Sequence, residues 1–560
     1  MRSRGVSFSA ALLSLSVSLA LAVPGCTQDT PKPPPVEPQP PVEPPPPEPL
    51  IPLEVTNPVL SGDFADPSVI KVGEEYWASA TSSEWAPQFP LLHSKDLLHW
   101  ELVGSVFTQQ PAWSEADPEK PESNYWAPEL AVDKGRYYVF YTARKKDGPL
   151  CVAVATASQP QGPYTDHGPL VCEELGSIDG AIIRDENDEL FLVWKLDGNS
   201  RGLPTPIWAQ RLDVSGNEPR LVGDKTQILL NDTPWEGQLI EGPHLIKRNG
   251  WFYLFYAGAG CCGRDCNYGV GVARSRKLLE GWEKNPLNPI MKNNESFKCP
   301  GHGSVVTDAK GRDYLLYHAY RTTDSVYVGR QGMLDVIQWG ADGWPTINSR
   351  RGPGGKVLTR FAPFSDEFTS QSLALGWQWP NTFPPVPSLA NGLLTLSVPT
   401  KDRANNPVGA ILARATNTGS YSAEAVLDVT GVTPGAQAGL AAVGDWDNWI
   451  GVVLNGDKVE VWRRYERQPV VVTSLDAPTP ADGKLTLRMK AKAGHRFLFS
   501  VRGEDGSWVD VGGEQDGGIS YRKDGPILLP PWDRGVRVGL TTGGAPDASA
   551  RFDSLRITPE

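Results

Sequence analysis

The stretch LIEGPHLIKRNGWFYLFYAG (residues 239–258) contains two short strands, a polar turn between them and a carboxylate at the start of the first strand. Glu241 stands directly before Gly-Pro, and the turn Lys-Arg-Asn-Gly is followed by the aromatic strand. This pattern predicts a β-hairpin. A single carboxylate at a strand opening has no meaning by itself, so its significance depends on whether the arrangement recurs.

The arrangement recurs five times. Aromatic strands with the sequences YWASAT, YYVFYT, LFLVWK, FYLFYA and YLLYHA begin at residues 76, 137, 190, 252 and 314. Each follows a turn and a shorter strand, and these shorter strands open at Asp66, Ala127, Asp179, Glu241 and His302. The openings are separated by 61, 52, 62 and 61 residues. A third strand and a polar turn follow each aromatic strand, so the chain is all-β and predicts a five-bladed β-propeller. A β-sandwich with the same number of strands gives no reason for this period.

Three of the five openings are carboxylates, namely Asp66, Asp179 and Glu241. The innermost strand of each propeller blade lies against the central axis, so equivalent positions on these strands converge. Carboxylates brought close together repel one another, which raises the pKa of at least one of them. Each acid alone reads as a turn residue or an exposed strand end. At matched repeat positions, we interpret them as one functional cluster.

A cluster of carboxyl groups has the composition that glycoside hydrolysis requires. One protonated carboxyl group donates to the leaving oxygen, and one ionised carboxylate activates water or attacks the anomeric carbon. A third acid can keep the pKa of the donor high. The 19 Trp residues also offer flat faces on which sugars can stack.

The segments FADPSVIKVGEEYW, NYWAPEL, SIDGAIIRDENDELFLVWK, IEGPHLIKRNGWFYLFYAG and GHGSVV resemble those of glycoside hydrolase family 43. The likeness covers residues 57–348. It implies a five-bladed propeller that acts on xylan or arabinan side chains or oligomers with inversion at the anomeric carbon. It also implies that Asp66 is the general base, Asp179 adjusts the pKa of the acid, and Glu241 is the general acid.

The same resemblance assigns three weaker candidates to the sugar site. Trp126 in YWAP matches a tryptophan that lines the sugar subsite, with a role in the blade core as the alternative. Arg330 in VGRQGMLD matches an arginine that reaches the sugar, with a structural ion pair as the alternative. His302 in GHGS matches a histidine near the channel centre, beside which some relatives bind calcium; a structural calcium ion is left open here, and the chemistry requires no cofactor.

Four further polar residues lie near these motifs but off the repeat position. We interpret them as structural: Asp63, Asp185, Glu236 and His244.

The pattern changes after residue 356. Alternating strands punctuated by Gly and Pro continue to residue 560, and no acid recurs among them, which predicts an antiparallel β-sandwich. FSDEFTSQSLALGWQWP and PVGAILARAT resemble the concanavalin-like domain that accompanies many family 43 β-xylosidases. Such a domain packs on the propeller and narrows its pocket; an independent carbohydrate-binding module is the alternative.

The N-terminal residues predict export. Arg2 and Arg4 precede an apolar run that ends in AVPGC, which resembles the lipobox of bacterial lipoproteins with Cys26 as the lipid anchor. An ordinary cleaved signal with an incidental cysteine is the alternative. The next residues are rich in Pro and predict an extended spacer. We therefore predict a signal peptide at 1–26, a linker at 27–53, a propeller at 54–356 and a sandwich at 357–560.

Composition and cysteines agree with an exported protein. The chain has 53 Lys and Arg against 65 Asp and Glu and lacks a dense basic face, which argues against a nucleic-acid partner. Without Cys26, six cysteines remain at 151, 172, 261, 262, 266 and 299. We predict disulfides rather than a metal knuckle in CCGRDC, with Cys151–Cys172 as one pair and the other pairings open.

These observations predict an inverting glycoside hydrolase held at the cell surface or outer membrane by lipid, with secretion as the alternative. Its substrate would be a xylan- or arabinan-derived oligosaccharide, cleaved as by a β-xylosidase or an α-L-arabinofuranosidase. The alternatives are an endo-arabinanase and a non-catalytic surface glycan-binding lipoprotein. The pattern indicates no oligomeric state.

Overall fold

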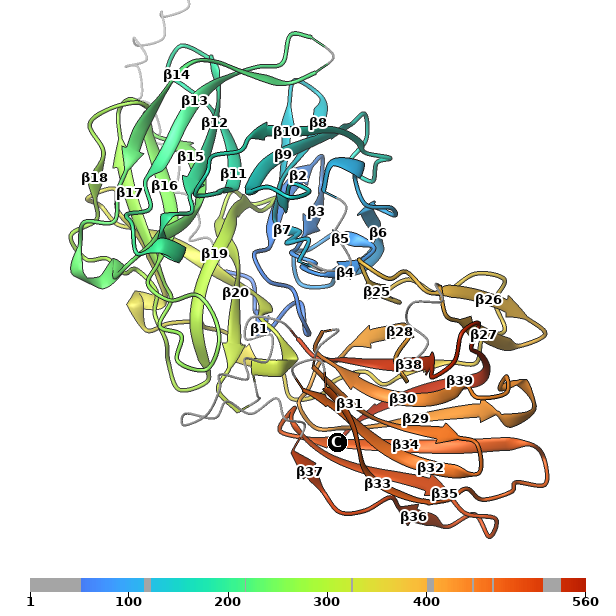
Figure 1. Ribbon diagram of the computed structural model, residues 1–560. Coiled ribbons are helices and arrows are strands. Elements are labelled where there is room, and N and C mark those ends of the chain that lie inside the picture. The colour runs from blue at the N-terminus through green and yellow to red at the C-terminus, as the bar shows by residue number, and fades with distance from the viewer. Residues whose placement is uncertain are drawn as a thin grey trace, which may run out of the picture. The chain divides into compact units, whose positions relative to one another are not determined.

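The computed structural model describes residues 52–114, 122–216, 218–323, 326–399, 407–445, 448–465, 468–516 and 535–560. Over this part the chain is all-β, with short 3-10 helices between strands (Figure 1). The predicted signal segment and nearly all of the predicted linker lie outside the described residues. The 3-10 helices are η1 (Ala112–Ser114), η2 (Gly198–Arg201), η3 (Pro234–Glu236), η4 (Val326–Val328), η5 (Asn348–Arg350) and η7 (Val429–Gly431).

The propeller comprises five four-stranded antiparallel sheets within the described residues, which confirms the predicted number of blades. Each blade takes its four strands from one continuous stretch of chain (Figure 1). Their strands are β2 (Ser68–Val72), β3 (Glu75–Ser79), β5 (Gln88–Ser94), β6 (Glu101–Phe107); β7 (Trp126–Asp133), β8 (Arg136–Arg144), β9 (Leu150–Ala157), β10 (Thr165–Val171); β11 (Ser177–Arg184), β12 (Leu190–Leu196), β13 (Ile207–Asp213), β14 (Arg220–Leu229); β15 (Ile240–Arg248), β16 (Trp251–Gly258), β17 (Gly269–Ser275), β18 (Glu283–Lys284); and β19 (Phe297–Thr307), β20 (Asp313–Arg321), β21 (Gln331–Trp339), β22 (Pro345–Ile347).

The aromatic second strands are apolar on both faces because each lies between two neighbouring blades. In β16, Phe252, Leu254 and Tyr256 enter a hydrophobic cluster shared with the third blade. Tyr253 and Phe255 point the other way, into a cluster shared with the fifth blade. Successive side chains of a strand point to opposite faces, so a strand covered on both sides needs a continuous apolar run. This requirement explains the aromatic runs that mark the repeat.

The hairpin formed by β15 and β16 has a two-residue turn. Arg248 pairs with Trp251, and Asn249 and Gly250 both have positive φ, at 50° and 73°. A two-residue turn of this kind matches the twist of the strands it joins and requires Asn and Gly there.

The second domain consists of two antiparallel sheets, which confirms the predicted sandwich class. Alternate residues of both sheets form one apolar core, including Leu427, Leu440, Leu487 and Val538. One sheet contains β24 (Phe364–Asp366), β26 (Val386–Ala390), β27 (Leu393–Ser397), β29 (Tyr421–Asp428), β34 (Lys484–Lys492), β35 (Arg496–Arg502), β36 (Trp508–Asp510), β37 (Gln515–Asp516) and β39 (Ser549–Pro559), and the other contains β28 (Ala410–Ala415), β30 (Gln437–Val443), β31 (Trp449–Asn455), β32 (Lys458–Tyr465), β33 (Gln468–Asp476) and β38 (Arg537–Gly543).

The two domains are joined by buried polar contacts. β25 (Trp379–Pro380) pairs with β4 (Trp85–Ala86), a short strand between β3 and β5 of the first blade. Asn381 also accepts a hydrogen bond from the buried Gln88 side chain at 2.7 Å. A parallel pair, β1 (Thr56–Asn57) with β23 (Lys356–Val357), joins the start of the propeller to the segment that leaves it. This arrangement favours a domain that packs on the propeller over an independent module.

The six cysteines outside the signal segment form three disulfides. Cys151 bonds to Cys172, as predicted. The residues of CCGRDC form two further bonds, Cys261–Cys262 and Cys266–Cys299. The pairings that remained open are thus decided by the fold. No helix in the described part of the chain has the length and apolar character needed to cross a membrane.

Candidate active site

The openings of the second to fifth blades lie at irregularities in their first strands. In the second, third and fifth blades, the irregularity contains Ala127, Asp179 and His302, whose φ angles are 43°, 58° and 37°. Asp66 of the first blade also has positive φ, at 50°. These four residues occupy one repeat position, as predicted.

The fourth blade differs by one residue from the predicted register. There the residue with positive φ is Gly242, and Glu241 occupies the position before it. Glu241 therefore corresponds to Trp126 and Ile178 rather than to Asp66 and Asp179. The spacing of the openings, which varies by up to ten residues, cannot resolve a shift of one. Glu241 nevertheless reaches the same cluster.

Gly242 makes room for His302. A Cβ atom at Gly242 would lie 2.7 Å from Cγ of the His302 ring, closer than real Cβ contacts. The His302 Nδ1 atom lies 3.5 Å from Asp66 Oδ1 and 3.9 Å from Asp179 Oδ2. His302 therefore stands between two of the predicted acids, and the structure brings these residues together.

Asp66 is buried, and its carboxylate is fully paired. Thr81 donates to Oδ2 at 2.7 Å, and Arg330 Nη1 donates to Oδ1 at 2.9 Å. Burial opposes ionisation, but the Arg330 guanidinium, together with the contacts of His318 and His302, outweighs it and holds the pKa of Asp66 well below its usual range. Asp66 is therefore ionised at neutral pH.

Glu241 is also buried, and both of its carboxyl oxygens accept hydrogen bonds. Lys195 Nζ donates to Oε2 at 2.7 Å, and Tyr268 Oη donates to Oε1 at 2.9 Å. Burial raises the pKa of Glu241, but the Lys195 ammonium and these hydrogen bonds outweigh that effect and lower it below its usual value. Burial also raises the pKa of Tyr268 well above 10, so its hydroxyl remains a donor.

Asp179 behaves in the opposite way. Its backbone N–H donates to Thr142 Oγ1 at 3.1 Å, and its Oδ2 accepts from Gly242 N–H at 2.9 Å. Burial raises the pKa of Asp179 to about 6; the nearby charge of Glu241 also raises it, and His302 opposes the shift. We expected the charge of Asp179 to keep the pKa of Glu241 high. Instead the raised pKa lies on Asp179, because Lys195 pairs with Glu241.

Lys195, Tyr268 and His318 belong to this cluster but escaped the sequence analysis. Lys195 is the last residue of LFLVWK, the aromatic strand of the third blade. By strand register, Lys195 corresponds to Thr142, Ala257 and His318 of other blades. Three of these four equivalent residues are polar, so this position of the aromatic strands was a second repeat signal beside the openings.

The three weaker candidates have different surroundings. Arg330 lies in the cluster through its ion pair with Asp66. Trp126 begins β7 at the position equivalent to Glu241, half-buried, and its Nε1 has no hydrogen-bond partner among the described residues. His302 lies beside Asp66 and Asp179. No group of three or more His, Cys, Asp or Glu suited to a metal ion occurs in the described ranges, so the calcium ion stays a prediction.

The residues interpreted as structural have structural partners. Asp63 pairs with Arg537 of the second domain at 2.8 Å, and Glu236 pairs with Lys284 at 2.7 Å. Asp185 accepts hydrogen bonds within its turn. His244 Nδ1 lies 2.8 Å from Glu129.

Asp66 is ionised, the pKa of Asp179 is raised and that of Glu241 is lowered. Neighbouring carboxyl groups with such different pKa values are typical of a general acid–base site. Comparison with known proteins identifies its class. The family model described as "Glycosyl hydrolases family 43" matches residues 55–345, and "Beta xylosidase C-terminal Concanavalin A-like domain" matches residues 365–558. The chain therefore belongs to glycosyl hydrolases family 43.

Individual relatives have names that refer to family 43. The chain is 32% identical to "Xylosidase/arabinosidase 43B" of Humicola insolens over 52% of this chain and 54% of that protein. It is 24% identical to "Non-reducing end alpha-L-arabinofuranosidase BoGH43B" of Bacteroides ovatus, over 83% of this chain and 89% of that protein. Among solved structures, the GH43 protein BlXynB of Bacillus licheniformis has a TM-score of 0.76 at 25% identity, covering 90% of this chain and 100% of that one. The chain thus spans only about half the length of the Humicola relative it matches.

Proposed function

We propose that this protein is an inverting glycoside hydrolase that removes xylose or arabinose units from xylan- or arabinan-derived oligosaccharides. The observation that carries the proposal is the buried cluster of Asp66, Asp179 and Glu241, in which the lowered pKa of Asp66 keeps a base ionised and the raised pKa of Asp179 keeps a proton next to Glu241. Such separation of pKa values lets neighbouring carboxyl groups act as base and acid at the same pH. The names of the family 43 relatives supply the pentose substrates.

In the proposed reaction, ionised Asp66 takes a proton from a water molecule as the water oxygen attacks the anomeric carbon. Glu241, carrying the proton that it shares with Asp179, gives this proton to the glycosidic oxygen as the bond from that oxygen to the anomeric carbon breaks. The sugar leaves with inverted configuration, with Asp66 protonated and Glu241 ionised. Proton exchange with solvent restores both groups.

A panel of p-nitrophenyl pentosides tests this proposal. We expect hydrolysis of β-xylosides or α-L-arabinofuranosides, with the inverted anomer appearing first in the proton NMR spectrum of the released sugar. Asp66→Asn is the matched control, because it removes the base while keeping the shape of the side chain. First formation of the retained anomer would contradict the roles assigned to Asp66 and Glu241.

Two alternatives give different results in the same assays. An endo-arabinanase would cut linear arabinan internally and leave short aryl pentosides intact. A surface glycan-binding protein would bind oligosaccharides without releasing sugar. The acid–base pair favours an enzyme over this second alternative, because binding requires neither an ionised nor a proton-donating carboxyl group.

We also propose that lipid on Cys26 anchors the protein to the outside of a bacterial membrane. The support is the sequence alone: the charged start, the apolar run, the cysteine at its end and the Pro-rich spacer that follows. Thr27, in place of Asp, favours the outer membrane in a Gram-negative host.

Fractionation of cells tests the anchor. Wild-type protein should be found in the membrane fraction, and Cys26→Ser should move it to the soluble fraction. Wild-type protein that is soluble, with an N-terminus other than residue 26, would favour the alternative of simple secretion.

A further inference from the structure

Lys195 is a buried cation for which the proposed reaction has no use. Its side chain is 1% exposed. Its Nζ donates to three oxygens: Glu241 Oε2 at 2.7 Å, Asn199 Oδ1 at 2.8 Å and Asp197 Oδ1 at 2.9 Å. An ammonium group has three hydrogens, so these partners use all of them and hold the group in one place. Burial of a cation costs free energy, and paired geometry of this quality is needed to offset it.

The other blades show that the fold does not require a lysine at this position. Thr142 accepts a hydrogen bond from the backbone N–H of Asp179 at 3.1 Å, and His318 accepts one from that of Asp66 at 3.0 Å. Thr81 likewise accepts from the N–H of Ala127 at 2.8 Å. Each of these side chains thus binds the backbone at the opening of the next blade.

Lys195 makes a different contact with its neighbouring blade. A lysine ammonium can donate but cannot accept, so it cannot bind a backbone N–H as threonine and histidine do. Its contact with the next blade is instead with the carboxylate of Glu241. Where the other blades have a contact between a side chain and the backbone of the next blade, Lys195 directly contacts the side chain of the predicted proton donor.

We propose that Lys195 is the positioning residue of Glu241: it orients the carboxyl group, stabilises its ionised form and thereby sets the upper pH limit of catalysis. This inference rests on the proposed function, because it takes Glu241 as the proton donor. The other groups that face Glu241 are the Tyr268 hydroxyl, His302 of β19 and Asp179 of β11. The negative charge of Asp179 disfavours the ionised form of Glu241, whereas the positive charge of Lys195 favours it. Asp66 interacts with Asp179 in the same cluster.

The pH dependence of kcat/KM for Lys195→Met tests this inference. The alkaline limb reports loss, in the free enzyme, of the proton that Glu241 shares with Asp179. Without the ammonium, we expect that limb to move upward by about 1 to 3 pH units. Lys195→Arg keeps the charge, so its limb should stay close to that of the wild type.

Lys284→Met is the matched control. Lys284, whose side chain is 14% exposed, pairs with the buried Glu236 at 2.7 Å in the fourth blade, and its hydrogen bonds go to Glu236, Asp232 and Leu230 rather than to the carboxylate cluster. Its removal should lower stability as the removal of Lys195 does, and should leave the alkaline limb unchanged. A purely structural role for Lys195 would therefore give the same profile in both variants.

An active Lys195→Met enzyme whose alkaline limb stays in place or moves downward would overturn the inference. If that variant does not fold, Lys195→Met with Asp197→Asn removes one charge of each sign and carries the same expectation. Carbon-13 NMR titration of the Glu241 carboxyl in the wild-type protein, assigned with Glu241→Gln, provides a test without any change at Lys195. A pKa at or above the ordinary 4.5 would contradict the inference. A wild-type enzyme inactive on every pentoside would instead refute the proposed function.

Discussion

Glu241 accepts hydrogen bonds at both carboxyl oxygens, from Lys195 and from Tyr268, so its substitution by Gln changes charge and proton supply while keeping its shape. We expect Glu241→Gln to fold and to lose about 10²- to 10⁴-fold in kcat on a natural oligosaccharide. The loss should be smaller for p-nitrophenyl glycosides, whose leaving group needs little protonation. Steady-state kinetics on both substrates check this expectation, and equal losses on the two would argue against proton donation by Glu241.

The upper pH limit of the wild-type enzyme follows from the shared titration of Asp179 and Glu241. The pKa of Asp179 is raised to about 6, and the two acids interact, so their apparent pKa values belong to the pair. Proton donation needs one proton on this pair, and the last proton leaves the pair near pH 6, so we expect kcat/KM to fall as pH rises through about 6. A pH–rate profile that stays flat to pH 8 would contradict this.

Asp179 should lower the stability of the folded protein at neutral pH. Its pKa rises from 3.8 unfolded to about 6 folded, so the folded state holds the proton more tightly. Its favourable contribution is present below about pH 4 and is lost as pH rises through 6. We expect Asp179→Asn to be more stable than the wild type by about 1–3 kcal/mol at pH 7, with no gain at pH 4. Thermal unfolding of both proteins at pH 7 and at pH 4 measures this difference in stability. An equal gain at the two pH values would point to a cause other than charge.

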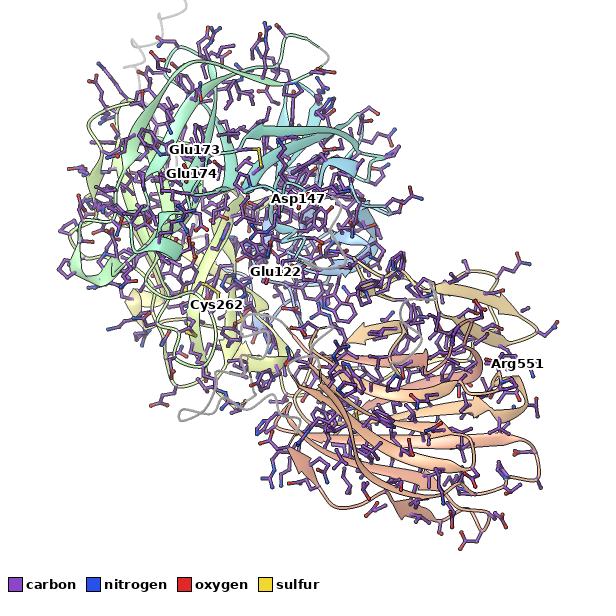
Figure 2. All side chains as sticks on the ribbon, in the orientation of Figure 1. Glu122, Asp147, Glu173, Glu174, Cys262 and Arg551 are labelled. Atoms are coloured by element: carbon purple, nitrogen blue, oxygen red, sulfur yellow. A yellow bond between two sulfur atoms is a disulfide. The ribbon has the colours of Figure 1, made fainter. Side chains whose placement is uncertain are left out.

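At the scale of elements, the Cys266–Cys299 disulfide joins two segments of the site. Cys266 lies two residues before Tyr268, which contacts Glu241, and Cys299 lies three residues before His302. The neighbouring Cys262, labelled in Figure 2, bonds to Cys261 in the same loop between β16 and β17. The Cys266–Cys299 bond thus holds the hydroxyl donor of Glu241 against the strand that carries His302.

We expect the double variant Cys266→Ser/Cys299→Ser to lose about 10- to 100-fold in kcat/KM, because small displacements of catalytic groups are costly. Cys151→Ser/Cys172→Ser is the control, because that bond joins strands already paired in the second blade. Both variants should lose about 2–4 kcal/mol of stability. Kinetics below the unfolding temperature of each variant separate the two effects, and equal activity in the two variants would show that the first bond only stabilises the fold.

At the scale of the whole molecule, Arg537 of the second domain is buried against the propeller. It pairs with Asp63 at 2.8 Å, and the adjacent Val536 N–H donates to Tyr327 O at 2.6 Å. Asp63 and Tyr327 each lie three residues before a member of the cluster, Asp66 and Arg330 respectively. The second domain therefore supports both members of the Asp66–Arg330 pair.

Arg537→Met should destabilise the protein by about 3–5 kcal/mol, because it removes the cation that pairs with the largely buried Asp63 carboxylate. Arg551→Met is the control within the same domain: Arg551, labelled in Figure 2, forms a partly exposed pair with Asp428 that should contribute at most about 1 kcal/mol. Calorimetry measures both. If Arg537→Met leaves propeller unfolding unchanged, the second domain is energetically independent of it.

The sequence by itself determined the features that depend on local pattern. Each aromatic strand lies between two blades and is therefore apolar on both faces. This pattern can be recognised in the sequence of a single hairpin, and its recurrence marks the blades. The convergence of Asp66 and Asp179 followed from the repeat, and that of Glu241 followed from it to within one residue. The pair Cys151–Cys172 followed from a single strand-turn-strand unit.

Only the tertiary structure decided which charges meet. Lys195 and Glu241 are 46 residues apart and belong to adjacent blades, and Asp63 and Arg537 are 474 apart in different domains. Closure of the propeller brings Lys195 to Glu241, and packing of the second domain on the propeller brings Arg537 to Asp63. The one-residue shift at Gly242 determines where Glu241 lies. The pKa of a buried acid depends on its nearest charges and its burial, neither of which a repeat period specifies. For this reason the sequence located the acids, whereas the packing of one blade against the next decided that Asp179, rather than Glu241, has the raised pKa.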